Sequence, residues 1–176
     1  GKPISLARST DATRSISNFR FFAEFARSQQ PLVFEMSDAT NYVDTSPLGI
    51  VGLITPWNLP LYLLTWKVAP ALLMGNCIIA KPSEITPLTA NLLARTMQKL
   101  QLPDGVFNLV HGLGPEVGQA ILEHPDIGGI SFTGGTSTGR IVARTAAPLF
   151  KKLSLELGGK NATIILDDAN LETVVP

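Results

Sequence analysis

The stretch from residue 130 to residue 160 carries the residues best placed to do chemistry. Gly134, Gly135 and Gly139 form a loop that opens a helix, where unpaired backbone N–H groups can hold a phosphate. Glu156 follows in the alternating segment 153–157, with leucines on both sides and a glycine pair after it. A carboxylate that such neighbours shield from water can act as a general base. Taken alone, each feature is more often an ordinary turn or a solvated strand residue.

Short apolar strands alternate with helices along most of the chain. The expected strands are 48–54, 77–81, 105–110, 127–132 and 153–157, and the expected helices are 2–28, 61–74, 88–101, the segment that ends at residue 122, and the segment after Gly139. Neighbouring parallel strands need such helical crossovers. The pattern therefore predicts the α/β class, with a Rossmann-like parallel sheet that carries helices on both faces.

The unusual residues fall in four turns, each between a strand and the helix after it. These turns are 55–58, 81–84, 112–114 and 134–139. In a doubly wound sheet such turns all lie at the carboxyl ends of the strands, where ligands bind. This convergence raises the odds of a ligand site well above those of any single motif.

The two ends of the chain carry further expectations. The helix over residues 2–28 is amphipathic, and Asp11 is expected to cap its main part. Its phenylalanine cluster is expected to be core, and consists of Phe19, Phe21, Phe22 and Phe25. Segments 32–36 and 42–45 suit a hairpin that stands away from the core. Residues 162–166 are expected to begin one more strand.

Composition excludes several classes of function. Lys plus Arg and Asp plus Glu both number 14, so the zero formal charge gives no case for binding nucleic acid or an anionic membrane. Prolines break the charge-free stretch 45–66, which excludes a transmembrane helix.

The single cysteine, Cys77, excludes an internal disulfide framework and favours a reducing compartment such as the cytoplasm. His111 and His124 are isolated, so no metal site is expected. A first residue other than Met suggests an excised piece.

Two familiar nucleotide-binding signatures fail. The glycine spacing from Gly134 is that of a P-loop, but Arg140 and Ile141 stand where the motif needs Lys and Ser or Thr. Gly112 and Gly114, followed by Gly118, miss the dinucleotide fingerprint by one residue.

Four blocks remain, in one order: 54–58 (ITPWN), 81–84 (KPSE), 132–135 (FTGG) and 155–160 (LELGGK). Together they closely resemble the NAD(P)-dependent aldehyde dehydrogenase superfamily, and the resemblance runs from Gly1 to Pro176. Segments 18–23 and 59–67 also resemble the branch of this family that oxidises 2-aminomuconic semialdehyde. The resemblance implies a partial NAD-binding domain over 1–28 and 48–159, an oligomerisation strand segment over 29–47, and the start of a truncated catalytic domain over 160–176.

The resemblance also implies roles. Asn58 would donate its amide to the oxyanion formed when a thiolate attacks an aldehyde, and Glu156 would be the general base. The residues implied to bind NAD are Ile54, Thr55, Pro56, Trp57, Lys81, Ser83, Glu84, Gly114, Gly118, Phe132, Thr133, Gly134, Gly135, Thr138, Leu157 and Gly158. This chain departs from the family in having Gly135 where Ser is usual and Thr138 where an aliphatic residue is usual. These departures weaken the detailed cofactor map rather than the class.

The nucleophile of the family is a cysteine beyond the last of the four blocks, outside this chain. Cys77 is no substitute, because it lies in an expected buried strand where a thiol is inert. The parent is expected to oxidise an aldehyde with NAD through a thiohemiacetal, as a homodimer or homotetramer, and the isolated chain to be inactive. Two alternatives stay open: a non-catalytic nucleotide-binding or assembly module, and a semialdehyde dehydrogenase that makes an acyl-CoA. The apparent base Glu156 favours the hydrolytic type over the latter.

Overall fold

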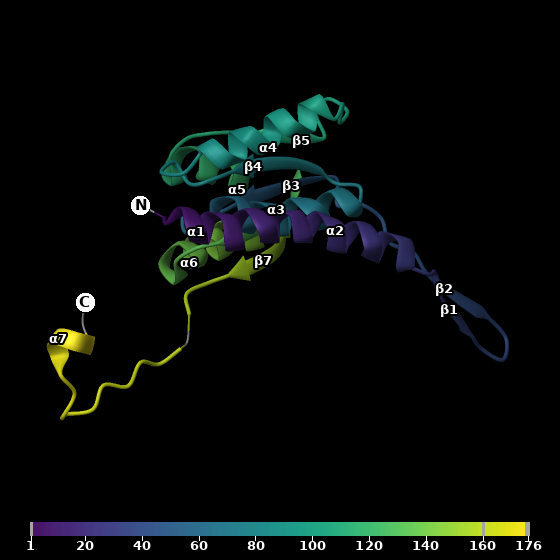
Figure 1. Ribbon diagram of the computed structural model, residues 1–176. Helices are drawn as coiled ribbons and strands as arrows, with labels where there is room; N and C mark the ends of the chain where they lie inside the picture. Colours follow the sequence, from purple (N-terminus) through teal and green to yellow (C-terminus); the bar gives the residue numbers. More distant parts are fainter. Residues whose placement is uncertain (1, 160, 175–176) are drawn as a thin grey trace.

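The computed structural model describes residues 2–159 and 161–174, and a five-stranded parallel sheet forms its centre (Figure 1). The strands are β3 (Ile50–Ile54), β4 (Cys77–Lys81), β5 (Phe107–Leu109), β6 (Ile127–Thr133) and β7 (Lys152–Glu156). Their order is β5-β4-β3-β6-β7, so the chain builds outward from β3 in one direction and then returns to build outward on its other side. This is the predicted Rossmann-like topology, with its switch point between β3 and β6.

Helices cover both faces of the sheet, also as predicted. One face packs against α3 (Pro60–Leu73) and α4 (Leu88–Lys99), with α2 (Thr13–Ser28) lying along α3. The other face packs against α5 (Gln119–Glu123) and α6 (Thr136–Ala146). A π-helical turn, η2 (Gly114–Gly118), precedes α5, and a 3-10 turn, η3 (Ala147–Leu149), follows α6.

The central strand β3 shows why its sequence is apolar throughout. Val51 and Leu53 enter the core under α3 and α4, whereas Ile50 and Ile54 pack in the core under α5 and α6. A strand covered on both faces needs apolar residues at successive positions rather than at alternate ones. At Gly52 a Cβ atom would lie 2.5 Å from the Ile121 side chain, so only glycine lets α5 approach this closely.

The N-terminal helix is continuous, but it buries less of its apolar surface than predicted. It consists of α1 (Ile4–Leu6), a π-helical turn η1 (Ala7–Ala12) and α2. Phe19 packs against the core and Phe22 is partly buried, but Phe21 and Phe25 are exposed, so the prediction of a phenylalanine core is wrong for these two. The reason is that part of the buried face of α2 is polar, since Ser15 and Asn18 are its buried residues, which leaves these two rings in solvent.

The expected cap at Asp11 is also corrected. Asp11 lies inside the helix, and its carboxylate accepts a hydrogen bond from the backbone N–H of Tyr62 in α3. It therefore caps another helix and not its own.

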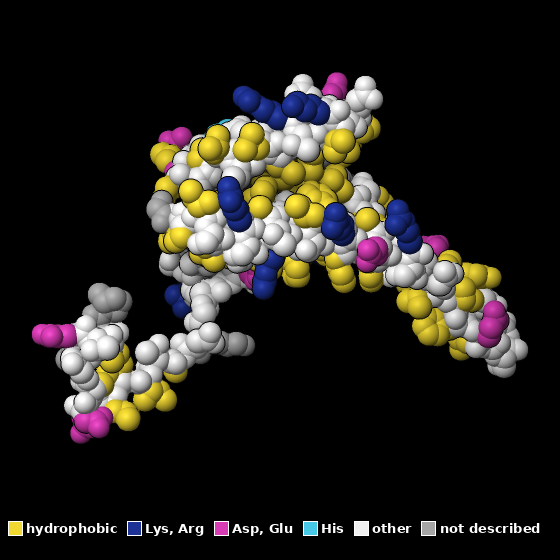
Figure 2. Space-filling model, viewed as in Figure 1, with side chains coloured by type: hydrophobic (Ala, Val, Ile, Leu, Met, Phe, Trp, Pro, Cys, Tyr) yellow, Lys and Arg dark blue, Asp and Glu magenta, His cyan; other side chains and the backbone are white. Residues whose placement is uncertain are grey.

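The hairpin and the C-terminal segment extend away from the sheet (Figure 1). Strands β1 (Leu32–Glu35) and β2 (Thr40–Val43) pair antiparallel as predicted, and every residue in them is exposed. Figure 2 shows hydrophobic side chains along this hairpin. Residues 161–166 form no strand, contrary to the prediction, because the described chain gives them no strand to pair with; the short helix α7 (Leu171–Val174) follows. Among the described residues, no helix has the length and apolar character needed to cross a membrane.

Candidate functional site

A cavity of about 610 Å³ lies at the carboxyl ends of the strands, where the four predicted turns meet. It is lined by every residue of the predicted NAD set except two: Ile54, Thr55, Pro56, Trp57, Lys81, Ser83, Glu84, Gly114, Gly118, Phe132, Thr133, Gly134, Gly135 and Thr138. Leu157 and Gly158 lie outside this lining. The fold thus brings together residues that are up to 88 positions apart, since the lining runs from Ile54 to Val142.

Five lining residues were not predicted: Pro115, Gln119, Leu122, Ile141 and Val142. Helical spacing is the signal that could have found them. Ile141 and Val142 lie three and four positions after Thr138, on the same face of α6. Leu122 has the same relation to Gly118. Sequence reasoning placed the loops correctly but did not extend the site along the helices that follow them.

The glycine loop between β6 and α6 is held by its own backbone. The N–H of Gly134 donates to the carbonyl oxygen of Glu156 at 3.0 Å. This N–H is therefore not free to bind a phosphate, contrary to the expectation. The N–H groups in the first turn of α6 have no acceptor within the helix, and they remain available. At Gly134 a Cβ atom would lie 2.5 Å from the Phe132 ring, which requires glycine. Gly135 is different, because a Cβ atom there would approach only Ser137, at 4.0 Å.

Two buried polar groups in the cavity fit a polar ligand. Thr55 is 3% exposed, and its hydroxyl finds no hydrogen-bond partner among the residues that the structure describes. Lys81 is also 3% exposed; its ammonium donates to the Pro82 carbonyl and lies 3.6 Å from the Glu84 carboxylate. Burying such groups costs free energy that hydrogen bonds to a ligand would offset. The cavity is thus suited to a ligand rich in hydroxyl and phosphate oxygens.

Glu156 ends β7 at the same edge of the sheet. Its carboxylate accepts a hydrogen bond from the Thr133 hydroxyl at 3.3 Å, and the residue is exposed. The expected shielding by leucines is therefore wrong for the described chain. Leu153 and Leu155 pack on the opposite face of the sheet, because alternate strand residues point to opposite faces.

Sequence reasoning missed Lys67. This residue of α3 is 6% exposed, and its ammonium donates to the Ser131 hydroxyl at 2.8 Å. Lys67 and Glu156 both line a second cavity, of about 500 Å³. Burial lowers the pKa of Lys67, and the negative charge of Glu156 partly opposes this by raising it. One sequence signal could have revealed the site: Lys67 is the single charged residue between Asp44 and Lys81.

Asn58 lies in the turn between β3 and α3, beside Trp57, and both residues are exposed. Cys77 lies at the opposite end of the strands, at the amino end of β4. It is half-buried, whereas full burial was expected. A five-residue strand spans about 13 Å, so its thiol is remote from the cavity. Among the described residues, no group of His, Cys, Asp and Glu could hold a metal ion.

Comparisons with known proteins agree with this geometry. The sequence pattern described as "Aldehyde dehydrogenase family" matches residues 1–176. The human protein named 2-aminomuconic semialdehyde dehydrogenase is 49% identical over 178 residues, which cover 100% of this chain and 37% of that protein. A putative aldehyde dehydrogenase from Burkholderia cenocepacia has a TM-score of 0.88 and 44% identity, over 98% of this chain and 35% of that one.

A solved NAD⁺ complex of an aldehyde dehydrogenase from Bacillus cereus has a TM-score of 0.88 and 41% identity, and again 98% of this chain and 35% of that chain are covered. The chain thus spans little more than a third of the length of the proteins that it matches. Because the family pattern covers it from end to end and its fold follows that of solved members, this chain belongs to the aldehyde dehydrogenase family.

Proposed function

We propose that the protein containing this chain oxidises an aldehyde to a carboxylic acid with NAD, and that this chain supplies the NAD cleft, an oxyanion donor and a general base. One observation carries the proposal: all but two of the predicted NAD residues, from four separate turns, line one cavity at the switch point of the sheet. Ligands of doubly wound folds bind at this point. The Bacillus cereus relative, which has the same fold, is described as an NAD⁺ complex.

In this proposal the cavity binds the adenosine and pyrophosphate parts of NAD. Lys81 and Glu84 hydrogen-bond the ribose hydroxyls, and the first turn of α6 receives the pyrophosphate at its N–H groups. Leu157 and Gly158, which follow Glu156 outside the cavity lining, border the nicotinamide. Bound NAD supplies the hydride acceptor for the oxidation.

The reacting groups lie at the same edge of the sheet. We place a cysteine thiolate from outside this chain as the nucleophile, whose attack on the aldehyde forms a thiohemiacetal. The Asn58 amide donates to the oxyanion that develops, and Glu156 accepts the proton of the nucleophile or of the water that releases the acid. Asn58 follows β3 and Glu156 ends β7, and these two strands are two strand spacings apart in the sheet, or about 10 Å.

The substrate and the compartment are also proposals. The human relative bears the name of a semialdehyde dehydrogenase, and we propose a semialdehyde substrate for this protein. A test is the rate of NADH formation with a semialdehyde compared with a simple aldehyde of the same length; equal rates would contradict the proposal. We also propose a cytoplasmic location, because this chain has one cysteine and no internal disulfide framework; imaging of the tagged protein checks it.

Replacement of Glu84 by Ser in the whole protein should weaken its preference for NAD over NADP. A carboxylate there can accept bonds from both ribose hydroxyls, whereas the 2′-phosphate of NADP would bring like charges together. Lys81, 3.6 Å away, offsets part of that repulsion. We expect kcat/KM for NADP to rise about tenfold, the size of one such charge interaction, in the Glu84→Ser protein. Glu116→Ser, which removes a carboxylate outside the cavity lining, is the control. Equal use of both cofactors by the unmodified protein would contradict the assignment.

The hairpin β1–β2 is proposed to contact a second copy of the protein. An isolated two-stranded hairpin is only marginally stable in water, and this one exposes six large apolar side chains: Leu32, Val33, Phe34, Met36, Tyr42 and Val43. Placing a charge there with Phe34→Asp should lower the molar mass of the whole protein in light scattering. A protein that is a monomer before the change, or keeps its full mass after it, would overturn this proposal.

A further inference from the structure

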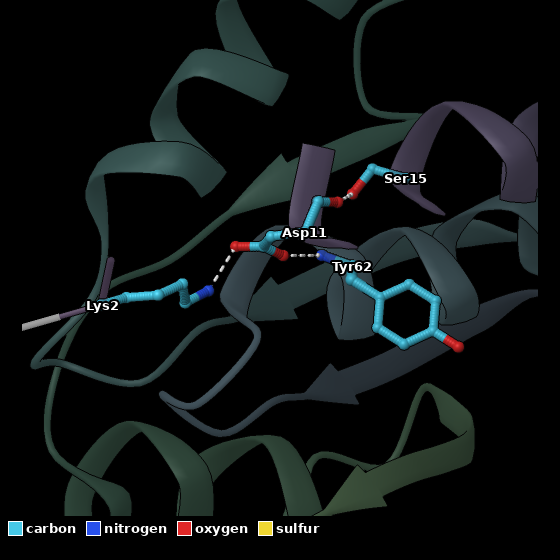
Figure 3. A network of polar contacts seen from close by, with 4 residues as sticks. All are labelled: Lys2, Asp11, Ser15 and Tyr62. Carbon is cyan, nitrogen blue, oxygen red and sulfur yellow. Dashed lines mark hydrogen bonds and ion pairs between the residues drawn. The ribbon is translucent and has the colours of Figure 1, made fainter. Parts of the chain in front are cut away.

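Asp11 is a buried carboxylate that the proposed chemistry does not use. It is 6% exposed and lies in the π-helical turn η1. As Figure 3 shows, one carboxylate oxygen accepts the backbone N–H of Tyr62 and the other pairs with the Lys2 ammonium, both at 2.7 Å. The Asp11 carbonyl also accepts the Ser15 hydroxyl. Buried carboxylates are costly unless they are paired in this way.

The start of α3 explains why this carboxylate is needed. Pro60 occupies the first helical position and has no N–H, and Leu59 before it offers an apolar side chain that cannot accept a hydrogen bond. The N–H of Tyr62, third in the helix, therefore needs an acceptor from elsewhere. Asp11 supplies it from a position 51 residues earlier in the chain. Its negative charge also interacts favourably with the dipole at the amino end of α3.

A second set of contacts also joins the N-terminal helix to Tyr62. The Asn18 amide donates to the Tyr62 carbonyl at 3.2 Å and to the Thr65 hydroxyl at 3.0 Å. The Arg14 guanidinium lies 5.5 Å from the centre of the Tyr62 ring. Both backbone polar groups of Tyr62 are thus bound by the N-terminal helix.

These contacts fix one end of the turn that carries Asn58. The turn leaves β3 at Thr55, whose N–H donates to the Lys81 carbonyl at 3.2 Å, and it enters α3 at Leu59. Trp57 and Asn58 are exposed between these two ends. The placement of the Asn58 amide therefore depends on how firmly the ends are held.

We infer that Asp11 is a positioning residue, which holds the amino end of α3 so that the Asn58 amide meets the oxyanion. The inference rests on the proposed function, because it needs Asn58 as the donor. Asp11 touches neither substrate nor cofactor in this account. It acts only through the Tyr62 backbone and the turn that precedes it.

The test is a double-mutant cycle in the whole protein. Asp11→Ala is expected to lower kcat about tenfold, because a displacement of about 1 Å at a reacting group can cost up to a hundredfold. The NAD dissociation constant should change less than twofold. Asp11→Asn keeps an oxygen that can accept the Tyr62 N–H, so it should restore most of kcat while losing the ion pair with Lys2. If Asp11→Ala does not fold, Asp11→Ser, whose hydroxyl is too short to reach, takes its place.

A matched control separates positioning from stability. Asn108→Ala removes two side-chain bonds, to the carbonyls of Ile78 and Gly105, at the far edge of the sheet. It should lower Tm without changing kcat. If Asp11 acts through Asn58, then Asp11→Ala should cause no further loss of kcat in an Asn58→Ala protein.

The same cycle distinguishes failure of the positioning role of Asp11 from failure of the proposed role of Asn58. If Asn58→Ala lowers kcat but Asp11→Ala leaves it unchanged, or lowers it equally in both backgrounds, then the positioning role is overturned and the oxyanion role stands. If Asn58→Ala itself leaves kcat unchanged, then the proposed function of Asn58 fails, and the inference about Asp11 fails with it.

Discussion

Glu156→Gln in the whole protein is expected to lower kcat by a factor of about 10² to 10⁴, the usual contribution of a general base. The amide can still accept the hydrogen bond that Thr133 donates at 3.3 Å, but it cannot take up a proton. The NAD dissociation constant should stay the same, because Glu156 lies outside the cavity that the NAD residues line. Steady-state kinetics and calorimetric titration with NAD measure the two quantities.

Glu24→Gln is the control for this substitution, since it removes an exposed carboxylate of α2 that lines neither cavity. A burst of NADH in the first turnover separates two forms of the hypothesis. If Glu156 activates only the water, the burst survives and later turnovers are slow; if it also activates the nucleophile, the burst is slowed as well. An unchanged steady-state rate would contradict both forms.

Asn58→Ala should lower kcat by a factor of about 10² to 10³, which is the measured range for removing one oxyanion donor. Alanine leaves the turn between β3 and α3 intact but has no N–H to offer the developing charge. The KM for the aldehyde should change little, because the bond strengthens only as the charge forms. Unlike Glu156→Gln, this change should slow the first turnover in every case.

Asn91→Ala serves as the comparison for Asn58→Ala. It removes a side-chain amide of α4 that donates to the carbonyl of Pro87, the residue before this helix. It should leave turnover unchanged. An Asn58→Ala protein that keeps its turnover within twofold of the unmodified rate would show that the oxyanion is stabilised by other groups.

The sheet and its turns could be predicted from sequence because their signals are local. Each strand is a short apolar run, and each helix follows at the spacing that a parallel crossover needs. The packing of the N-terminal helix was harder to predict, because amphipathicity shows that a helix has an apolar face but not which element covers that face. Part of its contact with α3 consists of the hydrogen bonds that Asp11 and Asn18 form with the Tyr62 backbone, which no periodicity reveals.

The candidate site divides in the same way. The general rule that ligands bind at the carboxyl ends of parallel strands placed the four turns together, and residues of all four turns line one cavity there. The surroundings of Glu156 were misjudged, because its flanking leucines point to the other face of the sheet. Lys67 was missed because its contact with Ser131 joins positions 64 residues apart.

A crystal structure of the protein with NAD tests the central claim most directly. We expect electron density for the adenosine ribose between Lys81 and Glu84, and pyrophosphate density at Gly135 and the first turn of α6. We also expect the Thr55 hydroxyl, which has no partner among the described residues, to gain one. NAD found in the cavity beside Lys67, or absent from the switch point at millimolar concentration, would contradict the proposed NAD site.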